Sequence, residues 1–311
     1  MKTALAGLLL LVCVPLCLAR PRPRYPMNVS AAGARVITFD VQEGDFVLRG
    51  DPAATSVRMM VGIDRFFLFK LGEEGILQRL IKVEGENTPE LTIRTDIPRA
   101  VSNWGRAEYP IDFEVIVPAN VTLRVRDTSG KIEIRGMSGA VEIHDTSGTL
   151  SVRNLAGPLT IDKESGDIAV TDVAGATRIA SHSGQMRLAR LADLQITSSD
   201  GNLDITGVAA ARLTNRGGNI RVTGVKGDLS IDDDSGEIVL DDVSGQVTIR
   251  DTSGQIRATR TGPITVNDTS GDIVVSRAAS LDVVTKEGGQ VKVAGVSGEV
   301  RVPAGTTLIR H

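Results

Sequence analysis

The phrase Asp-Thr-Ser-Gly constrains the fold of this chain more than any other feature. It first occurs at 127–130 and returns at 145–148, 251–254 and 268–271. A glycine or a small substitute recurs every nine residues, occasionally eight, as far as Gly298. Polar corners of this kind alternate with apolar ones such as Val243-Ser244-Gly245. The repeating unit is therefore about 18 residues with two corners, and it occurs about ten times.

After each glycine the sequence alternates between polar and apolar residues, as in Lys131-Ile-Glu-Ile134. Alternation over four or five residues that include β-branched types indicates a half-buried strand. Two short strands in a fixed period of this length predict a single all-β, parallel β-solenoid, in which each coil packs on its neighbours. Eight residues are predicted to point inward, namely Ile132, Ile134, Val141, Ile143, Ile161, Ile168, Val247 and Ile249. The apolar corner is expected to be filled by Met137, Leu155, Val173 and Val243, and each corner glycine is expected to supply a positive φ.

The chain divides into four expected parts. Residues 1–19 resemble a secretory signal peptide, with Lys2 before an apolar run that contains both cysteines, Cys13 and Cys17. Residues 20–34 are rich in Pro and Arg and are interpreted as an extended linker that forms no ladder. Residues 35–117 are predicted to be a β-rich N-terminal cap that is continuous with the solenoid, and residues 118–311 are the regular repeats. The mature chain would then have no disulfide and no membrane span.

Within the expected cap, strands are predicted near 36–41, 46–49, 56–62, 91–95 and 111–117. A short helix is predicted near 73–82, and 98–109 is predicted to be a loop. Because the open end of a solenoid needs a cover, this region is expected to close one end of the rod.

The passage from Ile111 to Gly130, with the phrases Ser-Gly-x-Ile-x-Ile that follow it, resembles the bacterial putative-adhesin β-strand-repeat family, a domain family of unknown function. The resemblance extends over roughly residues 36–302. It implies an exported protein of the cell envelope or surface, and it supplies no catalytic residues.

The amino-acid composition limits the classes of partner that the chain is expected to bind. The formal net charge of −3 and the absence of a basic stripe do not favour nucleic acid or an anionic membrane. All nine aromatic residues lie at or before Phe113, outside the regular repeats. If a small ligand binds, its contacts are therefore expected from Phe66, Phe67, Trp104 or Tyr109. The alternative is that these rings only cover the first coil.

Acidic residues at the corners form the other candidate site. Asp233, Asp242 and Asp251 are the possible calcium ligands, because calcium-binding β-rolls also have nine-residue half-coils. Turn chemistry is the favoured alternative, since this chain has enough apolar residues to close its coils without metal, and no cofactor is expected. One residue of each polar corner should stack on the next at about 4.8 Å, in the order Asp127, Asp145, Lys163, Ser181, Ser198, Asn215, Asp233, Asp251, Asp268 and Lys286. Each Asp run ends in a lysine that would neutralise it in water, and Lys286→Glu is expected to have only a slight effect.

Two functions follow from these features. The favoured one is an exported, non-enzymatic solenoid of the periplasm, cell surface or extracellular space, an adhesin-like or scaffold module whose partner is an envelope polysaccharide or a surface protein. The alternative is a polysaccharide-active or calcium-binding β-helix protein that uses the Asp-rich turns, for instance Asp233 and Asp251 as paired acids.

Overall fold

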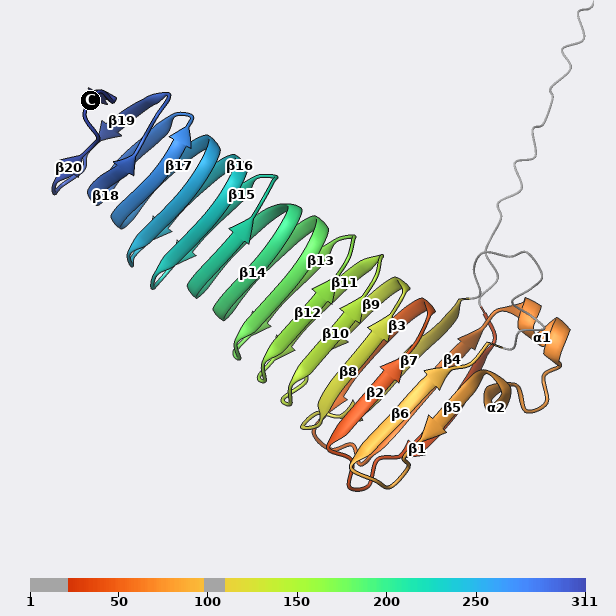
Figure 1. The fold of residues 1–311 in the computed structure, drawn as a ribbon. Coiled ribbons are helices and arrows are strands. Elements are labelled where there is room, and N and C mark those ends of the chain that lie inside the picture. Colours follow the sequence, from red (N-terminus) through yellow and green to blue (C-terminus); the bar gives the residue numbers. More distant parts are fainter. Residues whose placement is uncertain (1–21, 98–109) are drawn as a thin grey trace, which may run out of the picture.

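The computed structural model describes residues 22–97 and 110–311, which form a straight rod with a cap at one end (Figure 1). Two short helices lie beside the cap, and the strands stack from there to the C-terminal end. The strands are β1 (Arg24–Ser30), β2 (Val36–Asp40), β3 (Glu43–Asp51), β4 (Ser56–Ile63), β5 (Ile81–Glu84), β6 (Glu90–Thr95), β7 (Ile111–Pro118), β8 (Thr122–Asp127), β9 (Ser129–Arg135), β10 (Val141–Asp145), β11 (Thr149–Leu155), β12 (Leu159–Lys163), β13 (Ile168–Val173), β14 (Thr177–Asn215), β15 (Ile220–Val225), β16 (Leu229–Val243), β17 (Val247–Ser270), β18 (Ile273–Thr285), β19 (Gln290–Ala294), β20 (Val300–Arg301) and β21 (Thr307–Arg310); the helices are α1 (Arg65–Leu71) and α2 (Ile76–Leu80).

The predicted parallel solenoid is confirmed. Val141 lies opposite Leu159 in the next coil, which is a step of 18 residues. Leu203 lies opposite Ile220 in the next coil, so the step there is one residue shorter. The longest strands, such as β14, continue through the corners without a break. All eight residues predicted to point inward and all four predicted to fill the apolar corner are buried.

The corner glycines are required for two different reasons. Gly148, at a polar corner, has a φ of +100°, and a Cβ there would also overlap the carbonyl of Gly130 in the coil below. Gly157, at an apolar corner, has no positive φ, but a Cβ would overlap the Gly139 carbonyl. The prediction of a positive φ is therefore correct for the polar corner and wrong for the apolar one, where the close approach of two backbones excludes a side chain.

A left-handed residue comes directly before each apolar corner, a feature that the sequence pattern did not reveal. Asn154, for example, has a φ of +56° immediately before the buried Leu155. The full series with positive φ is Gly136, Asn154, Asp172, Arg190, Gly207, Gly224, Asp242, Arg260, Arg277 and Gly295. Because only four of these residues are glycine, packing of the next side chain into the corner must offset a left-handed penalty of about 1 kcal/mol at the others.

Chain order and stacking order differ in the cap. β2 lies between β8 and β6, and β3 lies between β9 and β7, all in parallel. Residues 36–51 therefore already form a regular coil, earlier in the chain than expected, and β6 with β7 form the coil beyond it. Antiparallel strands then follow, with β5 against β6, β4 against β7 and β1 against β4. This change of strand direction ends the parallel stack.

The interpretation of residues 20–34 as a linker is wrong for residues 24–30. Arg24–Ser30 is strand β1, which pairs along its whole length with β4. The N–H of Ile63 donates to the carbonyl of Pro23 at 3.0 Å. Because bonded and non-bonded pairs alternate in an antiparallel ladder, the nitrogen of Pro26 faces away from β4. A proline is compatible with such a strand at the edge of a sheet.

The two helices cover the end of the rod beside β5. The predicted helix near 73–82 is present as the shorter α2, and its Leu80 is fully buried. Helix α1 was not predicted. Its N-cap is Asp64, whose carboxylate accepts a hydrogen bond from the Phe66 N–H at 2.8 Å, and Gly72 ends it with a positive φ. The predicted loop at 98–109 lies outside the described residues.

Candidate functional site

The acidic residues proposed as metal ligands lie in two different corners. Asp233 and Asp251 are opposite each other in β16 and β17, as predicted. Asp242 is in the left-handed position before Val243, at the apolar corner. The structure therefore brings two of the three candidates together and leaves the third apart. Among residues 22–97 and 110–311, no group of three or more His, Cys, Asp or Glu side chains could hold a metal ion.

The polar corner is inside the rod, which corrects the expectation that its side chains are in water. Asp233 is only 2% exposed, and both of its carboxylate oxygens are buried. The order predicted for the ladder agrees with the observed register of Asp127 on Asp145 and of Asp145 on Lys163. Its two lysines are also buried, and they form ion pairs, Lys163 with Asp145 and Lys286 with Asp268.

Burial changes the expected consequence of reversing a charge in this ladder. The Lys286 ammonium lies 2.5 Å from the Asp268 carboxylate, and its side chain is 2% exposed. Lys286→Glu would leave two carboxylates buried without a cation, and a broken buried pair costs about 3–5 kcal/mol. The slight effect predicted from the sequence is therefore too small.

The buried carboxyl groups in the polar corner have raised pKa values. Burial raises the pKa of Asp233 from its ordinary value of 3.8 to about 7, and the charge of Asp251 adds to the effect. Burial likewise raises the pKa of Asp127 to about 7 and that of Asp251 to about 6. A protonated carboxyl can donate to a neighbouring carboxylate in the stack, which would satisfy atoms that are otherwise without a partner.

Stability is expected to fall between about pH 4 and pH 7. Folded Asp233 keeps its proton up to about pH 7, whereas an unfolded Asp loses it near pH 4. The folded state binds more protons in that window, so the free energy of unfolding decreases as pH rises, by at most about 1.4 kcal/mol per pH unit for one group. Asp233→Asn should therefore gain about 2 kcal/mol relative to the unsubstituted chain between pH 5 and pH 8 in urea unfolding. Asp232→Asn, on the solvent side of the same strand, is the control, and equal pH profiles for the two variants would contradict the prediction.

Calcium is expected to leave the melting temperature nearly unchanged at millimolar concentration. The two stacked acids are enclosed in the corner, and a buried lysine already pairs with one acid of each Asp run, Asp145 and Asp268. A ligand that binds only the folded chain raises its melting temperature. Differential scanning fluorimetry with calcium and with a chelator checks this, and a calcium-induced rise of about 10 °C, a shift that corresponds to more than 1 kcal/mol, would establish a metal site instead.

The aromatic candidates are dispersed. Phe67 is fully buried under the end of the rod, so its selection as a ligand contact is wrong. Phe66 is partly buried, and the Lys70 ammonium lies 5.8 Å from its ring centroid. Trp104 and Tyr109 lie outside the described residues. The rings of Phe39, Phe46 and Phe113 pack on one another inside the first coils, with centroids 5.1 and 6.2 Å apart.

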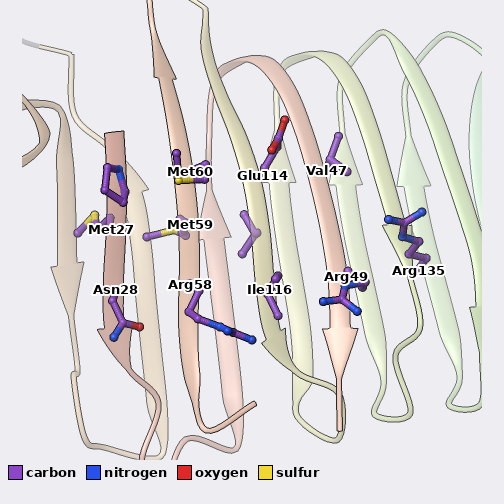
Figure 2. A pocket seen from close by; sticks show the side chains of 12 residues that line it. Met27, Asn28, Val47, Arg49, Arg58, Met59, Met60, Glu114, Ile116 and Arg135 are labelled. Carbon is purple, nitrogen blue, oxygen red and sulfur yellow. The ribbon is translucent and has the colours of Figure 1, made fainter. Parts of the chain in front are cut away.

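A groove of about 650 Å³ on the outer face of the cap is the strongest candidate site (Figure 2). It extends across β1, β4, β7, β3 and β9, which pair in that order. Outward-facing Met60, Ile116 and Val47 make its apolar surface, and Met60 is 37% exposed. Arg49, Arg58 and Arg135 also line it. A concave surface with apolar contacts and a few polar groups is the common form of a ligand site.

Sequence reasoning missed this groove because β7 and β9 are far in the chain from β1, β3 and β4, although they lie beside them in the sheet. Alternation places Arg58 and Met60 on the solvent face of β4, and Arg49 and Val47 on the solvent face of β3. Only the stacking order in the cap makes these residues neighbours. The one available signal was local, namely large apolar residues at positions where alternation calls for polar ones.

Residues 170–307 match the family described as Toastrack DUF4097. The match covers the regular coils from within β13 to the start of β21. Residues 170–307 are a toastrack domain. The groove is built entirely from residues that precede this toastrack domain, so the match identifies the rod and bears on no ligand of the cap.

Comparisons beyond the toastrack domain concern the fold. No curated protein matches the chain. A solved structure described as a putative cell adhesion protein from Clostridium sporogenes ATCC 15579 is 9% identical, with a TM-score of 0.35, over 71% of this chain and 99% of that one. Another, described as a putative adhesin from Parabacteroides distasonis ATCC 8503, is 14% identical, with a TM-score of 0.29, over 93% of this chain and 98% of that one. At these values neither likeness indicates a ligand. Among the described residues, no helix is long and apolar enough to cross a membrane.

Proposed function

We propose that this chain is an exported, non-enzymatic binding module of the cell envelope or surface, with an adhesin-like role. The rod acts as a spacer, and the groove on the cap holds the partner, an envelope polysaccharide or a surface protein. The observation that carries the proposal is the groove itself, which is open, has an apolar floor and has a volume of about 650 Å³. It lies at one end of a rod of uniform coils. The leader-like residues 1–19 support export.

A non-enzymatic role is supported by the position of the titratable groups. The acids with the largest pKa shifts, Asp127, Asp233 and Asp251, are buried within the polar corner. A glycosidase needs its two carboxyl groups beside the bond that is cleaved, and these side chains have almost no solvent contact. The alternative in which Asp233 and Asp251 act on a polysaccharide is therefore the weaker one.

The test is binding to a glycan array and to native envelope fractions, measured together with release of reducing ends from every glycan that binds. Met60→Asn removes an apolar contact of the groove without adding a charge, and it should reduce binding about fivefold or more, since truncating a good contact costs about 1 kcal/mol or more. Val284→Asn is a matched control, because Val284 is 52% exposed on the rod. Turnover of a bound glycan, or equal binding by both variants, would overturn the proposal.

A further inference from the structure

Four arginines form one row, three of them in the groove and the fourth, Arg153, on the next strand beyond it. Arg49 lies opposite Arg135 in β9, and Arg135 lies opposite Arg153 in β11. On the other side, Ile116 of β7 lies opposite both Arg49 and Arg58. Figure 2 shows Arg58, Ile116, Arg49 and Arg135 on successive strands of this face. The row therefore spans five strands, with one apolar residue among four cations.

The row is a local feature of a chain that is acidic overall, with a formal net charge of −3. Beyond Arg153 the same register position is occupied by Thr171 and then Ala189, so the positive charge ends one strand beyond the groove. Because charge is concentrated here against the net sign of the molecule, it favours an anionic partner at this face.

The guanidinium groups of these four arginines have N–H donors that no described protein group uses. Arg49 and Arg58 share one carboxylate, that of Asp51, at 3.7 and 3.6 Å. Arg153 lies 3.6 Å from Glu133, which also pairs with Lys131. The Arg135 guanidinium forms no hydrogen bond with the side chains of the described residues. The hydrogen bond from Lys131 lowers the pKa of Glu133, and the charge of nearby Arg135 adds to this effect. Each guanidinium carries five N–H donors, so these contacts leave most of them facing solvent.

The spacing of the row selects a linear ligand. Adjacent strands are about 4.8 Å apart, so five strands extend the row over roughly 19 Å. A single sugar or a small acid can reach only part of that length. A polysaccharide with one carboxylate on each sugar presents charges at intervals close to one strand spacing, and guanidinium binds carboxylate through two parallel hydrogen bonds.

We propose that the row binds a linear polysaccharide of carboxylated sugars that lies across the strands. Its carboxylates pair with Arg58, Arg49, Arg135 and Arg153, and its apolar sugar faces contact Ile116 and Met60. This inference rests on the proposed function, in which the groove is the binding site, and it adds the chemical class of the ligand. None of the described residues that line the groove is aromatic, which disfavours a single-stranded nucleic acid because such strands bind by base stacking.

The test uses the full mature chain with two probes of equal length, a galacturonic acid oligomer and its methyl ester, in isothermal titration calorimetry. The acid should bind at least about tenfold more tightly than the neutral ester, since hydrogen bonds between charged groups are stronger than those to a neutral ester. Binding should weaken as sodium chloride screens the ion pairs between the arginines and the carboxylates.

The double variant Arg49→Gln with Arg135→Gln should reduce the affinity for the acid oligomer about tenfold or more. Arg257→Gln with Arg301→Gln, two exposed arginines of the rod, should change it less than about twofold, with all melting curves compared.

Each other outcome overturns the inference and shows whether the proposed function survives. Equal binding of acid and ester that Met60→Asn weakens would keep the groove as a site but refute the carboxylate row. Binding of dextran sulfate or polyphosphate without binding of the uronic acid oligomer would refute the ligand class. Equal losses in the two double variants would mean non-specific attraction. Failure to bind any glycan or envelope fraction would refute the inference and the proposed function together.

Discussion

Replacing Ile143 with aspartate is expected to lower the free energy of unfolding by about 5 kcal/mol, since it removes a buried aliphatic side chain and places a carboxylate in an apolar interior. Ile143 is 1% exposed and lies between Val125 and Ile161 of the neighbouring coils. A carboxylate at this position would have only apolar residues directly opposite it in the neighbouring coils, and no cation. Urea unfolding followed by circular dichroism measures the loss.

The adjacent residue is the control. Glu142 points outward and forms an ion pair with Arg124 at 2.8 Å, with 38% of its side chain exposed. An exposed pair of this kind contributes at most about 1 kcal/mol, so Glu142→Ala should be nearly neutral. Equal losses for the two variants would contradict the inward and outward assignment of the whole strand.

Lys163→Met is expected to destabilise the rod by about 3–5 kcal/mol near pH 8. The Lys163 side chain has no exposed surface, and its ammonium is hydrogen-bonded to the buried carboxylate of Asp145. Without it, Asp145 and its neighbour Asp127 would have no cation next to them in the stack. Methionine keeps most of the volume, so that the loss reports the charge and not a cavity.

The loss from Lys163→Met should shrink towards pH 5, because Asp145 can then take up a proton and no longer needs the cation. Burial already raises the pKa of Asp145, in spite of the bond to Lys163. Lys131→Met is the matched control, since this lysine pairs with Glu133 at the surface and is 51% exposed. Urea unfolding at both pH values would measure these effects, and a loss that is the same at both would mean that packing, not charge, makes Lys163 necessary.

Much of the rod could be derived from the sequence because its interactions are local and repeated. Alternation in Lys131-Ile-Glu-Ile134 decides which side chains are buried, since successive residues of a strand face opposite sides. The distance between corner glycines decides the length of a coil, and therefore that Val141 lies on Leu159. The order of the polar ladder followed from the same count.

Tertiary structure decided the rest. No local pattern states that Val36 lies opposite Thr122, so the place of β2 and β3 between β6–β7 and β8–β9 appears only when the coils are stacked. The groove and its arginine row depend on that order, because β7 lies between β3 and β4, which are consecutive in the chain, and Arg135 comes from β9, far from both in the sequence. The burial of the polar corner is also a tertiary property. An Asp-Thr-Ser-Gly turn has the same sequence whether its aspartate faces water or the interior, and only packing by the coils on either side removes the water.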